Sequence, residues 1–85
     1  MTTGTKHSRS TWSVRSGQDL GRAIAEIRRD RGLTQHQLAE SIQLDRAYLA
    51  GVETGRSVRM IDHVLRALRH LGAEVTITWL PDEPS

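Results

Sequence analysis

The sequence predicts one mainly α-helical domain with a single β-strand near its C-terminal end. Three observations predict this fold class: the length of 85 residues, runs of apolar residues at helical spacing that end at Gly, and a change to strict alternation after Gly72. Only 36% of the residues are apolar and Phe is absent. A chain this small with so few large side chains buries little surface, so we expect a partner subunit.

Residues 1–15 contain mostly Ser, Thr, Gly and basic residues without helical spacing, and we expect a flexible basic arm. The short alternation at 11–14 also allows a brief strand there. The main domain is predicted at 16–72. Its first helix begins after Ser16, an N-cap with Asp19 in the capping-box position, and ends at Gly32. The apolar face of this helix contains Leu20, Ala23, Ile24 and Ile27.

Three further helices are predicted after Gly32. Thr34 caps the second, and Asp45 caps the third, which covers 46–54 and stops at Gly55. A tight connection at 42–45 joins these two helices, and a loop with Arg56, Ser57 and Arg59 leads to the last one. The last helix ends at Gly72 and has the clearest apolar stripe of the chain: Ile61, Val64, Leu65, Leu68 and Leu71.

The pattern at 73–80 predicts a strand, because Val75, Ile77 and Trp79 alternate with polar residues. A lone strand leaves backbone groups unpaired, so it needs a partner strand. The candidates are residues 11–14 and the same strand of a second subunit. We favour the second subunit, because small oligomers are usually two-fold symmetric dimers. Val75, Ile77 and Trp79 are then dimerisation residues, and Trp79 either forms a cross-strand aromatic contact at the seam or faces a protein partner. Residues 81–85 form an acidic tail that we expect to be disordered.

The composition excludes several functional classes. The absence of Cys excludes disulfides, a thiolate nucleophile and a cysteine-ligated zinc. The four His show no metal-ligand spacing, and no nucleophile, base and orienting group form a set, so we expect neither a metal, nor a cofactor, nor enzymatic activity. No apolar run approaches the ~20 residues of a membrane span, and residues 1–15 lack a signal peptide's apolar stretch. We therefore expect a soluble cytoplasmic protein without a membrane partner.

Charge is distributed unevenly along the chain, although the net charge is only +2. Residues 1–31 have a net charge of +4, residues 32–70 of +1, and residues 71–85 of −3. A basic front favours a polyanionic partner, with ordinary solvated surface charge as the alternative.

The segment 33–55 resembles the helix-turn-helix of phage-repressor-like (Xre-type) regulators. The resemblance rests on Leu-Thr-Gln followed by Leu-Ala at 33–39, on Val52-Glu53-Thr54-Gly55, and on the closing helix that ends at Gly72, and it covers about residues 18–72. It implies a five-helix-type repressor-like domain whose second helix of the motif enters a DNA major groove. Two positions depart from the pattern: Gln43 stands where the family usually has Gly in the turn, and Gly51 replaces a longer side chain.

This resemblance implies two sets of DNA contacts. The groove-facing, base-contacting set is Arg46, Ala47, Tyr48 and Gly51, in which Arg46 can fork onto guanine and Ala47 can touch a thymine methyl group. The phosphate-contacting set is Gln35, Arg56, Ser57 and Arg59. The alternatives are that Gln35 caps its own helix and that the loop arginines are merely solvated. Arg28, Arg29 and the arm are expected to add nonspecific affinity, and Glu53 to bond within the fold.

The strand directly after the last helix resembles the layout of HipB-like antitoxins. That resemblance implies a homodimer on a palindromic double-stranded operator, repression of its own operon, and a complex with a HipA-like serine/threonine kinase toxin, in the nucleoid-containing cytoplasm of a bacterium. Two alternatives stay open. One is a stand-alone Xre-type regulator, and the other is a protein-interaction module that has lost DNA binding.

Overall fold

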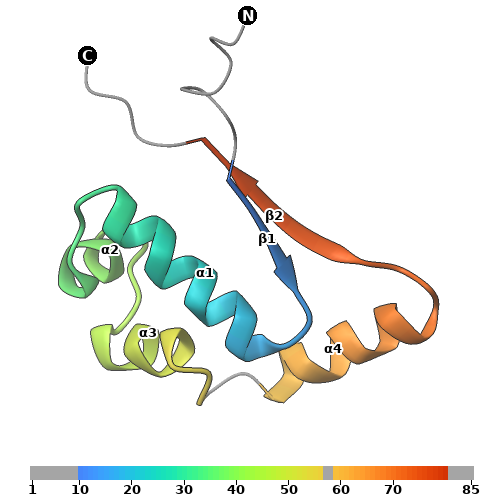
Figure 1. Ribbon diagram of the computed structural model, residues 1–85. Helices are drawn as coiled ribbons and strands as arrows, with labels where there is room; N and C mark the ends of the chain where they lie inside the picture. Colours follow the sequence, from blue (N-terminus) through green and yellow to red (C-terminus); the bar gives the residue numbers. More distant parts are fainter. Residues whose placement is uncertain (1–9, 57–58, 81–85) are drawn as a thin grey trace, which may run out of the picture.

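The computed structural model describes residues 10–56 and 59–80, which form four helices and two strands (Figure 1). The order of elements is β1 (Ser10–Val14), α1 (Gly17–Asp30), α2 (Gln35–Ser41), α3 (Arg46–Glu53), α4 (Arg59–His70) and β2 (Val75–Trp79). The predicted mainly helical fold is confirmed. The described residues form four helices rather than the five of a five-helix-type domain, and α4 begins at Arg59, which we expected in the preceding loop.

The strand β2 pairs with β1 of the same chain in an antiparallel two-stranded sheet. Thr11 lies opposite Thr78, and Trp12 lies opposite Ile77. We had favoured pairing with a second subunit, and the structure instead gives β2 the internal partner. The reason is that α4 and the residues after it return the chain antiparallel to β1 (Figure 1). Residues 10–14 thus belong to the fold and not to an arm, whereas residues 1–9 and the tail 81–85 lie outside the described residues.

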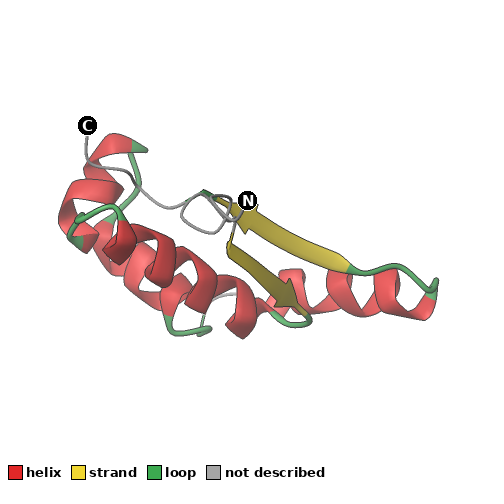
Figure 2. Ribbon diagram, turned by 45° about the horizontal axis from the view of Figure 1, so that its top comes forward, coloured by secondary structure: helices red, strands yellow, loops and turns green. Residues whose placement is uncertain are grey.

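One face of the sheet is apolar and lies over α1 (Figure 2). Val14 on this face is buried, with 4% of its surface exposed. The rings of Trp12 and Trp79 lie diagonally across the two strands, with centroids 6.5 Å apart. Val75, Ile77 and Trp79 are all half-buried. The cross-strand aromatic contact that we expected at a dimer seam therefore forms within one chain.

The helix starts are fixed by the predicted capping residues. The Ser16 hydroxyl accepts a hydrogen bond from the Asp19 N–H at 3.1 Å, but the Asp19 carboxylate accepts from the Arg15 N–H and so completes no capping box with Ser16. At α2 the box is complete, because Thr34 and Gln37 each accept from the backbone N–H of the other. Asp45 caps α3 through the Tyr48 N–H.

All four helices end with the same backbone arrangement, in which a residue of positive φ follows the cap. At three ends this residue is Gly, as predicted: Gly32, Gly55 and Gly72, with φ of 71°, 83° and 84°. At the end of α2 it is Gln43, with φ 60°, the only described non-glycine residue of positive φ. The Gln43 and Leu44 N–H groups donate to the carbonyls of Glu40 and Ala39 at 3.2 and 2.8 Å, which is a Schellman motif. The turn therefore keeps the left-handed conformation that the Gly of related turns suits.

The buried core is small and contains few large apolar side chains. Its members among the described residues are Val14, Ala23, Ala25, Ala39, Leu49 and Leu65, and no large side chain of the described part is completely buried. The helices α1 and α3 pack closely at Gly21, where a Cβ atom would lie 2.0 Å from the Val52 carbonyl oxygen. The molecule is flat, 41 × 35 × 16 Å, with α2 near one end of α1 and α4 near the other (Figure 1).

Candidate nucleic-acid interface

The helices α2 and α3 form the two-helix motif, joined by the turn at 42–45. The first turn of α3 is open to solvent, with Arg46, Ala47 and Tyr48 all exposed. Tyr48 exposes 52% of its surface, which is large for an aromatic side chain of a small domain. Three of the four predicted base-contacting residues therefore lie together on an accessible helix start.

A buried ion pair connects the end of α1 to the end of α3. The Glu53 carboxylate accepts from Arg28 Nε at 2.8 Å and from Arg28 Nη2 at 3.1 Å. The two side chains expose 11% (Arg28) and 4% (Glu53) of their surface. Arg28 Nη1 also donates to the Leu33 carbonyl at 2.8 Å, which fixes the loop before α2. The expectation that Glu53 bonds within the fold is confirmed, and Arg28, which we expected to add affinity for DNA, is instead used inside the protein.

Gln35 extends this ion pair to the surface. Its amide nitrogen donates to Glu53 Oε1 at 2.9 Å, and its amide oxygen accepts from Arg46 Nη1 at 3.2 Å. Four side chains from three helices thus form one continuous chain of hydrogen bonds that ends at an exposed guanidinium. The bond to Gln35 uses one of the five N–H donors of Arg46, and the others stay available to a ligand.

The electrostatics of Glu53 agree with this arrangement. Burial by itself would raise the pKa of its carboxyl group, but hydrogen bonds from Arg28 and Gln35 and the positive charges of Arg28 and Arg29 outweigh burial. The pKa of Glu53 is therefore lowered from its usual value, and the group is charged at neutral pH.

Gly51 does not lie on the exposed face of α3, contrary to the expectation. It is buried, because this part of α3 packs against α1. Ala50, which is half-buried, and Thr54, which is exposed, continue the open face of Ala47 instead. The sequence could have indicated that both residues share this face, because they follow Ala47 at the helical spacing of three and seven positions.

The structure describes three of the four predicted phosphate-contacting residues. Arg56 and Arg59 are exposed on either side of the connection between α3 and α4, and Ser57 lies outside the described residues. Gln35 is half-buried, and its amide already has two protein partners. Arg29 is exposed and lies 4.0 Å from Glu26. Arg29, Arg46, Arg56 and Arg59 are therefore accessible cations.

The ion-pair network had a sequence signal that our interpretation missed. Arg28 continues the stripe of Leu20 and Ile24 at a spacing of four, and Glu53 follows the buried Leu49 at the same spacing. A charged residue in line with an apolar stripe indicates a buried, paired charge.

In the described part of the chain, no group of three or more His, Asp or Glu side chains is arranged to hold a metal ion. None of the helices at 10–56 and 59–80 combines the length and hydropathy of a membrane span.

The family comparison agrees with the geometry. Residues 19–76 match the family model described as a helix-turn-helix domain, which is more than half of the chain. Searches among curated proteins and among solved structures give no significant match. The matched segment contains α2, the turn at 42–45 and α3 together with the helices that support them. Domains of this kind are DNA-binding modules rather than enzymes. The chain therefore belongs to the helix-turn-helix domain family.

Proposed function

We propose that the protein is a sequence-specific transcriptional repressor that binds a palindromic operator as a homodimer. The observation that carries the proposal is the exposed Arg46 at the start of α3, held by a hydrogen bond to Gln35 that continues into the buried Glu53–Arg28 pair. A solvent-accessible guanidinium that a hydrogen bond orients at the start of a recognition helix suits the O6 and N7 atoms of guanine.

The network contributes to recognition by positioning Arg46 before DNA binds. A free Arg side chain loses about 2 kcal/mol of rotamer freedom when it is fixed. Part of that cost is met in the folded protein, because Gln35 is held by Glu53 and restricts Arg46 in turn. Ala47 and Tyr48 complete the proposed base-contacting surface, with Ala50 and Thr54 taking the place that we first gave to Gly51.

Phosphate contacts complete the proposed interface. Arg56 and Arg59 flank the connection after α3 and are exposed, so they can follow the DNA backbone beside the groove that α3 enters. We keep Ser57 and Gln35 in this set, with Gln35 acting chiefly through Arg46. Such contacts make affinity fall steeply with salt, without selecting a base sequence.

The same surface supports a finer proposal, in which the repressor is an antitoxin that regulates its own operon and neutralises a HipA-like serine/threonine kinase. Its support is the order of the last helix, Gly72 and a strand. β2 pairs with β1 of the same chain along one edge, so a shared strand ribbon, as this layout suggested, would have to form at its other edge. A stand-alone regulator is therefore the competing proposal. Nuclease-treated pull-down from the native cells decides between them, because the antitoxin proposal requires a stoichiometric kinase in the eluate.

DNA recognition is tested by selecting binding sites from a random duplex library with the wild type, Arg46→Ala, and Arg22→Ala. Arg22 is an exposed arginine of α1 and serves as a charge-matched control. We expect the wild type to select a palindrome. We expect Arg46→Ala to lose about 1–3 kcal/mol and to relax one position of each half-site. Failure of the wild type to select any sequence would favour the protein-interaction alternative.

A further inference from the structure

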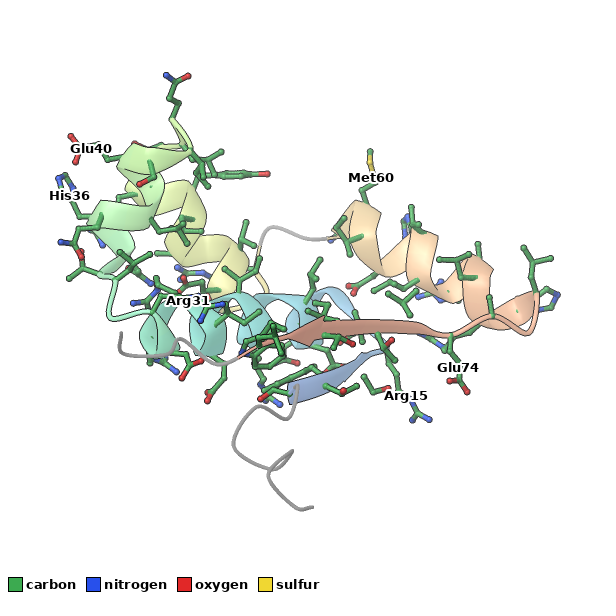
Figure 3. The ribbon with its side chains drawn as sticks, turned by 90° about the horizontal axis from the view of Figure 1, so that it is seen from above. Arg15, Arg31, His36, Glu40, Met60 and Glu74 are labelled. Atoms are coloured by element: carbon green, nitrogen blue, oxygen red, sulfur yellow. The ribbon has the colours of Figure 1, made fainter. Side chains whose placement is uncertain are left out.

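The helix α4 presents two apolar faces, and only one of them packs against the rest of the chain. Leu65 is buried, and Ile61 and Leu68 beside it are half-buried. The other face is exposed: Met60 exposes 76% of its surface, Val64 51% and Leu71 79%. Figure 3 shows Met60 pointing away from the sheet. The predicted single stripe of this helix is thus divided between the core and the solvent.

The exposed face has the spacing of a helix–helix seam. Met60, Val64, Ala67 and Leu71 follow one another at intervals of four, three and four residues, and all four are exposed. This is the spacing by which coiled-coil helices keep one apolar seam towards a partner helix. Leu71 directly follows α4 and still donates its N–H to the Ala67 carbonyl, so the seam continues to the end of the helix.

The seam is complementary to itself when two copies of α4 run antiparallel. A two-fold axis placed midway along the seam sets Met60 against Leu71 of the partner subunit, and Val64 against Ala67 of the partner subunit. The larger side chain of the inner layer then faces the smaller one, which lets the two helices approach closely. A parallel arrangement would place each residue against its own copy. The pair of small Ala67 side chains would then give the weakest packing, near the middle of the seam.

Two other observations indicate a second copy of the chain as the occupant. The described core is small, with three Ala among its six apolar members, so a large part of the apolar surface remains to be buried. One edge of the strand β2, which we first expected to hold the dimer, is already paired with β1 within the chain. An isologous contact of one helix with its own copy is the simplest way to cover the remaining face.

We infer that α4 is the dimerisation helix and that it pairs antiparallel with α4 of a second copy through Met60, Val64, Ala67 and Leu71. The inference deepens the proposed function, because it names the contact that holds the homodimer on a palindromic site, and its biological role rests on that function. Dimer formation itself is independent of DNA and is measured without it.

The register is tested by cysteine cross-linking, for which the natural chain is suited because it contains no Cys. In the antiparallel seam, position 60 faces position 71 of the partner subunit, whereas two copies of position 60 are about 16 Å apart along the helix axis. A disulfide needs Cα atoms within about 7 Å. We therefore expect Met60→Cys alone and Leu71→Cys alone to stay uncrosslinked under mild oxidation, and their mixture to form a covalent heterodimer. Thr76→Cys, on the exposed face of the sheet, is the matched control.

Sedimentation equilibrium of the 9.5 kDa chain supplies a second measurement. We expect a concentration-dependent dimer for the wild type and for Thr76→Lys, and at least a tenfold weaker dimer for Val64→Lys, with circular dichroism confirming that each variant is folded. A monomeric wild type would overturn the inference, as would self-crosslinking of Met60→Cys or an unchanged dimer in Val64→Lys. If the dimer forms as expected but selects no DNA sequence, the proposed function fails while this inference stands.

Discussion

Replacing Glu53 with Gln removes the negative charge that faces Arg28 and nearly keeps the shape of the side chain. The Arg28 side chain, which is 11% exposed, would keep the Leu33 carbonyl as one acceptor. A neutral amide oxygen would take the place of the Glu53 carboxylate as the other. Removing one partner of a buried ion pair costs about 3–5 kcal/mol, and the retained acceptor places this change near the lower end, at about 3 kcal/mol. An 85-residue domain has a total free energy of unfolding of about 4–13 kcal/mol. The substitution should therefore lower Tm by about 12–24 °C.

Urea unfolding followed by far-UV circular dichroism measures this loss. Glu26→Gln is the control, because the Glu26 side chain is 55% exposed and lies 4.0 Å from Arg29, and such a surface contact contributes little. Arg28→Met combined with Glu53→Gln should lose less than the sum of the two single losses, because the double variant leaves neither charge buried alone. Additive losses, or a free energy of unfolding for Glu53→Gln within about 0.5 kcal/mol of the wild type, would refute the role given to this pair.

The pH dependence of stability provides an independent check on Glu53. Its pKa in the folded protein lies below the usual value of 4.5. The charged carboxylate therefore contributes its full stabilisation above about pH 4.5, and this stabilisation is lost as the pH falls through the lower pKa of the folded protein. The difference in unfolding free energy between the wild type and Glu53→Gln should shrink on acidification below that range. A difference that stays constant there would show that Glu53 is not the group that titrates.

Two further predictions concern the backbone. Gln43→Gly should raise the free energy of unfolding by up to about 1 kcal/mol, because it relieves a positive φ of 60°, and Gly32→Gln, the reverse change at the equivalent position after α1, should lower it by a similar amount. Equal and opposite shifts in urea midpoint check this pair, and a loss of stability in Gln43→Gly would contradict it. Gly21→Ala should cost about 1–3 kcal/mol or more, because its Cβ would lie 2.0 Å from the Val52 carbonyl oxygen and force α1 away from α3. Thermal unfolding measures this loss, and an unchanged Tm would show that the two helices are not packed as described.

The sequence predicted the helix boundaries well, because these are decided by local hydrogen bonds. Thr34 and Asp45 offer side-chain oxygens to the first turns of α2 and α3, and Gly32 and Gly55 adopt the positive φ that ends a helix. These interactions span at most a few residues, so the sequence alone contains the needed information.

The partner of β2 could not be predicted in the same way. β1 contains five residues, and its alternation is too short to distinguish a strand from an irregular arm. Its pairing with β2 depends on where four helices return the chain, which is a property of the tertiary fold. The burial of Gly51 and the meeting of Arg28 with Glu53 depend likewise on how α1 packs on α3.

Methylation interference at guanine N7 tests the central claim most directly, namely that Arg46 on α3 reads a guanine. The assay uses the operator selected by the wild type, with Arg46→Ala and Arg22→Ala as the two comparison proteins. We expect methylation of one guanine in each half-site to block binding of the wild type and of Arg22→Ala, and to have no effect on the residual binding of Arg46→Ala. If methylation of that guanine inhibits Arg46→Ala as strongly as the wild type, or if no guanine is sensitive, the assignment of Arg46 as the base-reading residue is wrong.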